Sequence, residues 1–127
     1  MSPSDGPSKK CSSKNLPSEH QEQAGFVFWF RQRFPGVLIF AIPNGARVGM
    51  GQAKKLVAEG LTRGIPDLCI PEWRLWVEMK KKGGTLSPDQ KRIKAYLEGL
   101  GETVLVGDGA EDASRKILEI RSSLSPR

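Results

Sequence analysis

Three residues near the middle of the chain, Asp67, Glu78 and Lys80, have the types and spacing that phosphodiester hydrolysis needs. Two carboxylates supply hard oxygen ligands, which suit Mg²⁺ or Mn²⁺ rather than zinc. A cation held there would polarise a phosphate and lower the pKa of a bound water. A neighbouring lysine could orient that water or stabilise charge in the transition state. The chemistry requires that the fold bring the three side chains to one place.

The spacing of the two strands that carry these residues predicts how they meet. If the turn between the strands pairs Ile70 with Leu75 in an antiparallel ladder, Asp67 stands opposite Glu78, with β-carbons roughly 4.5–5.5 Å apart. Lys80 shares the face of Glu78, because side chains in a strand alternate faces. Two facing carboxylates repel each other, and a divalent cation between them removes that cost. Taken singly, each fragment is also typical of a strand boundary or a solvated strand face.

The pattern around these strands predicts a mixed α/β domain in the order αβ(α)ββαβα, with helices flanking a mixed central sheet. Capping boxes begin helices at Ser18 and Ser87, with Gln21 and Gln90 as their third residues. Expected helices span 18–34, 51–59, 87–100 and 110–122, and expected strands span 37–42, 67–70, 75–79 and 103–106. The apolar run at 37–42 indicates a buried strand, and the helix at 51–59 is expected to pack through Leu56 and Val57.

The 127 residues suit one domain. Residues 1–17 are expected to be a disordered tail, 18–122 the folded domain and 123–127 a C-terminal tail. The net charge of +6 favours polyanionic partners, nucleic acid before an anionic membrane surface. No apolar stretch approaches the length of a membrane span, and no secretory signal is evident. Cys11 and Cys69 form no metal or disulfide pattern, which favours a reduced, cytoplasmic setting.

The sequence resembles the VRR-Nuc branch of the PD-(D/E)XK nuclease superfamily over roughly residues 18–120. The segments that carry this resemblance are Gly64-Ile65-Pro66-Asp67-Leu68, Val77-Glu78-Met79-Lys80, Ser87-Pro88-Asp89-Gln90, Glu22-Gln23, Pro43-Asn44-Gly45, Gly101 and Gly107. The chain looks like a stand-alone member of the phage type, and such an origin implies the cytoplasm of a bacterial host.

The resemblance implies a restriction-endonuclease-like core that binds Mg²⁺ or Mn²⁺ through Asp67, Glu78 and the backbone carbonyl of Met79. It implies that Lys80 is the catalytic lysine and that Gln90 lies near the active site, where it helps to place Lys80 or water. Stand-alone members are similar to Holliday-junction resolvases. The resemblance therefore implies a homodimeric DNA endonuclease that acts on Holliday junctions or other branched DNA.

Supporting residues are expected around this site. Glu22 lies on the apolar face of the first helix, where it could reach the metal, bond a helix end or lie at the edge of the apolar stripe; Glu19, one turn earlier, is its rival. Basic residues that could contact DNA phosphates are Lys81, Lys82, Lys91, Arg47 and Lys54, although each could instead be a solvated charge.

Two other function classes fit the same residues. A non-catalytic DNA-binding module on this fold would bind without cutting, and such relatives usually lack one of the three catalytic residues that this chain keeps. An interaction protein that is basic by chance would bind DNA weakly or without dependence on salt. Among nucleases, a preference for flaps, nicks or plain duplex is the alternative to branched DNA.

Overall fold

The computed structural model describes residues 17–43 and 49–123 and follows the predicted order of elements. Arg47 and most of the two expected tails therefore lie outside the described residues. The mixed α/β class is confirmed. The helices are α1 (Glu19–Arg33), α2 (Met50–Ala58), α3 (Pro88–Gly99) and α4 (Ala110–Ser123); the strands are β1 (Phe40–Ala41), β2 (Leu68–Ile70), β3 (Leu75–Lys80) and β4 (Thr103–Asp108).

The four strands form one mixed sheet in the order β1-β2-β3-β4. β2 pairs with β1 and with β3 in antiparallel fashion, whereas β4 runs parallel to β3. Ile70 lies opposite Leu75 and Leu68 lies opposite Val77, so the register expected from the sequence is confirmed. The connection is a short 3₁₀ turn that ends at Arg74, whose φ of 52° is left-handed.

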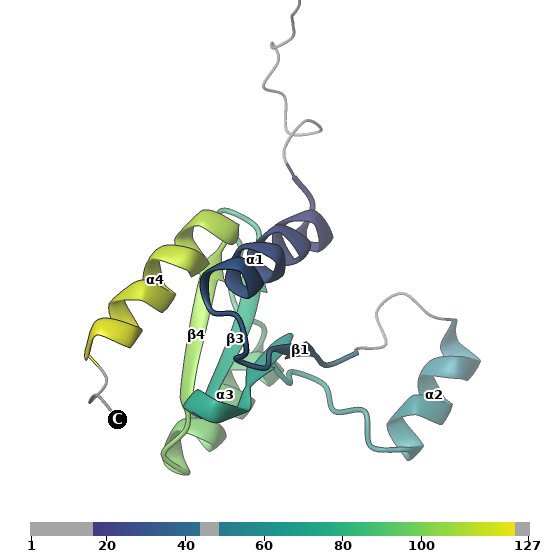
Figure 1. Ribbon diagram of the computed structural model, residues 1–127. Helices are drawn as coiled ribbons and strands as arrows, with labels where there is room; N and C mark the ends of the chain where they lie inside the picture. Colours follow the sequence, from purple (N-terminus) through teal and green to yellow (C-terminus); the bar gives the residue numbers. More distant parts are fainter. Residues whose placement is uncertain (1–16, 44–48, 124–127) are drawn as a thin grey trace, which may run out of the picture.

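Helices cover both faces of this sheet (Figure 1). α1 and α4 pack on one face over the larger core, which includes Val77 and Met79 of β3. α3 packs on the other face, where Trp76 contacts a smaller apolar cluster and donates a hydrogen bond from its indole nitrogen to Glu102 over 3.0 Å. Glu78 alternates with Val77 and Met79, so it belongs to the α3 face. No helix in the described ranges has the length and apolar character of a membrane span.

The prediction of a buried strand at 37–42 is wrong in extent and in burial. Only Phe40 and Ala41 pair as a strand, and the side chains of Leu38 and Phe40 are 59% and 41% exposed. Among the described residues, β1 is an edge strand and has a partner on one side only. Ile39 packs into the larger core, while its neighbours face away from that core and stay exposed.

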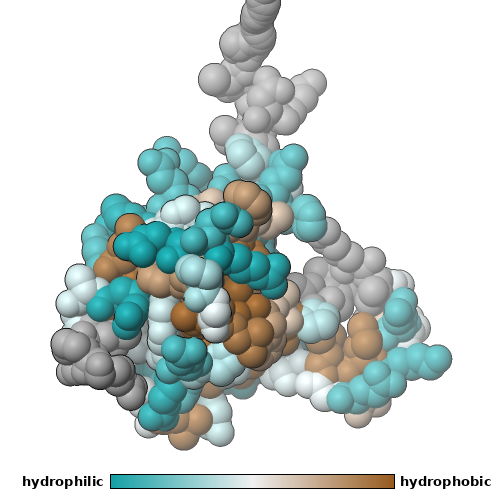
Figure 2. Space-filling view, viewed as in Figure 1, coloured by the Kyte–Doolittle hydropathy of each residue, from teal (hydrophilic) through white to brown (hydrophobic). Residues whose placement is uncertain are grey.

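α2 forms at the predicted place but does not pack as predicted. None of its residues is buried, and Val57, expected to be an apolar contact, is 51% exposed. Figure 1 shows α2 standing apart from the sheet, and apolar surface is visible on it in Figure 2. A helix of nine residues that has no fully buried side chain gains little stability from packing.

Candidate active site

A pair of carboxyl groups meets where β2 begins and β3 approaches its end. Asp67 directly precedes β2, and its Oδ2 accepts a hydrogen bond from the backbone N–H of Met79 over 2.8 Å. Glu78 lies on β3 and is only 4% exposed; it is the charged residue that the described chain buries most fully. The two carboxyl groups are close enough for one, when protonated, to donate a hydrogen bond to the other. The facing arrangement expected from the ladder is therefore present.

The surroundings of this pair oppose ionisation of both acids. Burial is the main cause that raises the pKa of Glu78 to about 8, and the charge of Asp67 raises it further. Burial also raises the pKa of Asp67, although the bond from Met79 partly offsets that effect. The charge of Lys80 lowers both pKa values, so one cation only partly compensates the buried Glu78 and the half-buried Asp67.

Lys80 ends β3 on the same face as Glu78, two residues along the strand. Its backbone carbonyl accepts a hydrogen bond from Gly109 over 2.7 Å, which ties the end of β3 to the turn before α4. Within residues 17–43 and 49–123, no carboxylate lies within ion-pair distance of its ammonium group. The ammonium group is therefore available to a ligand or a water at the carboxylate pair.

Gln90 connects the N-terminus of α3 to the pair. Its side-chain oxygen accepts a hydrogen bond from the backbone N–H of Ser87 over 2.8 Å and so closes the predicted capping box. Its side-chain amide donates to Oε2 of Glu78 over 3.0 Å. Gln90 therefore caps the helix and holds the carboxyl group of Glu78 at the same time. The capping box and the place near the site, both expected from the sequence, occur together.

The two acidic residues of α1, Glu19 and Glu22, interact with different parts of the molecule. Glu22 accepts a hydrogen bond from the backbone N–H of Ala110 over 2.7 Å, so its carboxylate occupies the N-terminus of α4. This is the helix-end alternative considered for Glu22. Glu19, by contrast, raises the pKa of both Asp67 and Glu78 through its charge. Of the two acids, Glu19 acts electrostatically on the carboxylate pair.

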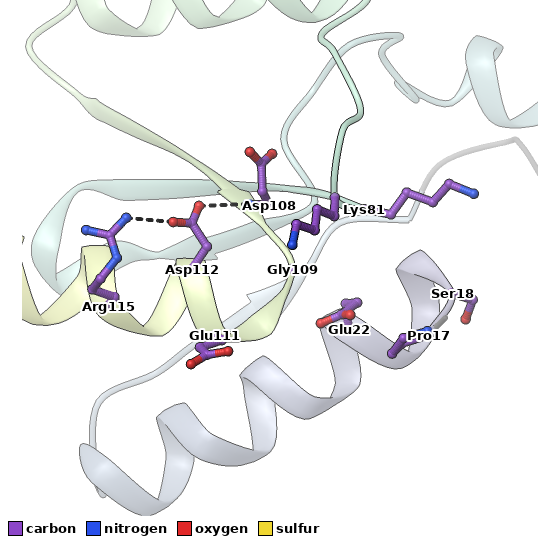
Figure 3. Close-up of a pocket in the computed structure, with 10 residues that line it drawn as sticks. Pro17, Ser18, Glu22, Lys81, Asp108, Gly109, Glu111, Asp112 and Arg115 are labelled. Atoms are coloured by element: carbon purple, nitrogen blue, oxygen red, sulfur yellow. Dashed lines mark hydrogen bonds and ion pairs between the residues drawn. The ribbon is translucent and has the colours of Figure 1, made fainter. Parts of the chain in front are cut away.

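A separate open pocket of about 950 Å³ lies between the start of α1 and the start of α4 and is lined by Glu22, Lys81, Lys82 and the first turn of α4 (Figure 3). Asp112 in this pocket bonds to Arg115 and to the backbone N–H of Asp108. Lys81 and Lys82 are exposed and follow Lys80 directly, whereas Lys91 on α3 and Lys54 on α2 are exposed elsewhere.

A smaller cavity on the α3 face touches the pair itself. Pro66, Glu78, Gln90 and Lys94 are among its lining residues. The sequence did not single out Lys94 as a residue of the site. Its spacing of four residues from Gln90 nevertheless puts both side chains on one helical face. Its ammonium bonds to Glu98 over 2.9 Å.

The site can be compared with known proteins. A solved structure described as "VRR_NUC domain protein" superposes with a TM-score of 0.68 and 27% sequence identity, over 83% of this chain and 88% of that chain. Over most of its length the chain is similar to this VRR_NUC domain protein. Its mixed four-stranded sheet with flanking helices has the restriction-endonuclease-like fold expected from the sequence. No protein-family model matches the sequence, and no curated protein matches it.

The donor atoms of the candidate site suit a hard divalent cation. Among the described residues, no group of three or more histidine, cysteine or carboxylate side chains converges as a metal site. Asp67 and Glu78 would therefore be the side-chain ligands, with a backbone carbonyl and water completing the shell. Mg²⁺ is commonly bound by one or two carboxylates and keeps several waters, so this small oxygen donor set fits it. A cation would also remove the repulsion between the two neighbouring carboxylates.

Proposed function

We propose that this protein is a nuclease of the VRR-Nuc type, a DNA endonuclease that hydrolyses phosphodiester bonds with Mg²⁺ or Mn²⁺ as cofactor. The observation that carries the proposal is the pair formed by the half-buried Asp67 and the buried Glu78, with the ammonium-bearing residue Lys80 on the same face. Buried like charges are costly for a fold, and functional sites are where such cost is commonly found. The likeness to a nuclease-domain protein supports the same chemistry.

Each residue of the site has a distinct part in the proposed reaction. Asp67, Glu78 and the backbone carbonyl of Met79 hold the cation, which supplies polarisation of the phosphate and a water of lowered pKa. Lys80 orients the attacking water or stabilises charge that develops on the phosphate oxygens. Gln90 holds the carboxyl group of Glu78 in place through the bond that its amide donates.

Two further groups shape the charge around this chemistry. The N-terminus of α3 carries the positive end of its helix dipole, which favours a phosphate near Gln90. We assign the contribution of α1 to Glu19 rather than to Glu22, because the charge of Glu19 acts on both carboxyl groups while Glu22 bonds to Ala110.

DNA is proposed as the substrate, and branched DNA such as a Holliday junction as its preferred form. The net charge of +6 and the exposed Lys81 and Lys82 beside the site favour a polyanion. A second copy of the chain is proposed as partner, since two copies can engage the symmetrical arms of a junction. The exposed apolar residues on the β1 side and on α2 offer surface for that contact; they are Leu38, Phe40, Met50 and Val57.

One panel of assays tests this proposal. Four-way junction, flap, linear duplex and supercoiled plasmid are incubated with the protein in Mg²⁺, in Mn²⁺ and in chelator, and molar mass is measured in solution. We expect cleavage in metal alone, fastest on the junction, and a dimer mass. Tight, salt-sensitive binding without cutting in either metal would overturn the nuclease and favour a DNA-binding module. A monomer that cuts only linear duplex would overturn the branched-DNA preference alone.

A further inference from the structure

Gly64 is packed against the backbone of α3 more tightly than any side chain would permit. Its φ is +86°, and a β-carbon built on it would lie 2.4 Å from the carbonyl oxygen of Asp89 and 2.5 Å from the carbonyl carbon. These are backbone atoms in the first turn of a helix, so they cannot move aside as the end of a flexible side chain can. Carbon atoms pack best at about 3.5–4.0 Å, so any substitution would force the two segments apart by roughly 1 Å.

The two segments that meet at Gly64 carry opposite halves of the candidate site. Asp67 lies three residues beyond Gly64 and bonds to the N–H of Met79. Gln90 is the residue next to Asp89 and bonds to Glu78. Between Gly64 and Asp67, Ile65 packs on the apolar cluster of α3, and Pro66 is buried and lines the cavity at Glu78 and Gln90.

We infer that Gly64 is a positioning residue that sets the distance between the segment bearing Asp67, just before β2, and the helix turn bearing Gln90. The inference deepens the proposed function, and the effect on catalysis rests on that function. The spacing between the two segments is a property of the metal-free fold. Close contact at Gly64 lets the amide of Gln90 reach Glu78 while Asp67 stays bonded at Met79. A shift of about 1 Å would lengthen the 3.0 Å bond of Gln90 beyond the range of a hydrogen bond.

Gly60 provides a matched control in the same segment. Its φ is +112°, so Gly60→Ala incurs the same kind of backbone strain, but a β-carbon there would meet no atom within 4 Å. Comparing Gly64→Ala with Gly60→Ala therefore separates the effect of contact with Asp89 from the effect of an unfavourable φ. Gly64→Asn is a second variant, because asparagine tolerates the left-handed region better than other side chains.

The experiment records two NMR reporters in the metal-free proteins, the side-chain amide of Gln90 and the backbone amide of Met79. The cleavage rate at saturating DNA is then measured for the same folded proteins. We expect Gly64→Ala and Gly64→Asn to move at least one of these signals and to lower the rate about 10²-fold, with DNA affinity unchanged. Gly60→Ala should leave both signals and the rate close to wild type.

Three results would overturn the inference. Both reporters could stay in place in folded Gly64 variants, Gly60→Ala could reproduce the same changes, or both Gly64 variants could fail to fold while Gly60→Ala folds. The last result would show that Gly64 serves the fold as a whole rather than the site. If the wild-type protein cuts no substrate, the proposed function fails, whereas the NMR comparison still decides whether Gly64 sets the spacing.

Discussion

Glu78 is an acid that the fold keeps out of water beside a second acid. Its carboxyl group is buried on the α3 face, where it accepts a hydrogen bond from Gln90 and lies against Asp67. Only the charge of Lys80 favours its ionised form among the groups that shift its pKa most. Such an arrangement is unfavourable for the metal-free protein at neutral pH, and a bound cation would reverse the balance.

The raised pKa of Glu78 predicts how stability depends on pH. The folded protein keeps a proton on Glu78 between its ordinary pKa of 4.5 and about 8, whereas the unfolded chain has released it. The free energy of unfolding of the metal-free protein should therefore fall as the pH rises through this range. Thermal unfolding in chelator checks this, and Glu78→Gln should remove much of the fall and raise the melting temperature at pH 8.

Glu119→Gln serves as the control for that experiment, because it makes the same chemical change at an exposed position on α4. It should keep the pH dependence of the wild type. Adding Mn²⁺ at pH 8 should stabilise the wild type and Glu119→Gln more than Glu78→Gln. A wild-type stability that increases steadily from pH 5 to pH 8 in chelator would contradict the assignment of a protonated Glu78.

Lys80 is predicted to act mainly on the reaction and only weakly on the fold. Its ammonium makes no close ion pair among the described residues and acts on the two carboxyl groups only through its charge, so Lys80→Ala should lower the melting temperature modestly. Loss of a group that stabilises transition-state charge typically costs about 10²–10³ in rate. Single-turnover cleavage of a four-way junction measures this, and a Lys80→Ala protein that cuts at the wild-type rate would exclude Lys80 from the chemistry.

α3 positions the site through its first turn, where Ser87 and Gln90 close a capping box. Ser87→Ala removes the hydroxyl that accepts from the N–H of Gln90, and we expect a loss of about 1 kcal/mol in the free energy of unfolding. Denaturant unfolding checks the value. Ser123→Ala removes a hydroxyl that bonds only to a carbonyl of α4, so its effect should stay within about 0.5 kcal/mol. Equal effects of the two variants would argue against the cap.

Local signals in the sequence were enough to predict much of this arrangement. The register of β2 and β3 follows from the turn that pairs Ile70 with Leu75, and that register alone places Asp67 against Glu78. The capping box at Ser87 likewise fixes where α3 begins, and hence where Gln90 lies. These features depend on residues close together in the chain, so pattern and turn chemistry determine them.

Features that depend on distant parts of the chain were not predictable in the same way. Glu19 and Glu22 lie on one face of α1, and the choice between them depends on Ala110, which is 88 residues away from Glu22. The apolar run at 37–42 gives no sign that its strand lies at the edge of the sheet. The close contact of Gly64 with Asp89 likewise joins two separate segments, and it depends on how α3 packs in the folded protein.

The charge of the entire chain predicts how it should bind DNA. With a net charge of +6, affinity for duplex should fall steeply with salt, because binding releases counterions from the phosphates. Lys81→Ala and Lys82→Ala should each reduce the slope of log affinity against log salt by about 1 if each lysine contacts one phosphate. Fluorescence anisotropy over a salt series measures the slope.

Arg33→Ala is the control for this series. It removes one charge at the last turn of α1, whereas Lys81 and Lys82 follow the end of β3 beside the first turn of that helix. Its slope should remain that of the wild type. If all three variants change the slope equally, the binding is a property of net charge, and the lysines beside the site do not contact phosphate.

The most direct test of the account asks whether cleavage depends on the carboxylate pair. Four-way junction is incubated in Mn²⁺ with the wild type, Asp67→Asn, Glu78→Gln and the surface control Glu119→Gln, each verified as folded by circular dichroism. The account predicts cleavage by the wild type and by Glu119→Gln, and a loss of at least about 10²-fold in rate for the other two. Cleavage by Asp67→Asn at the wild-type rate would contradict the assignment of this pair as the active site.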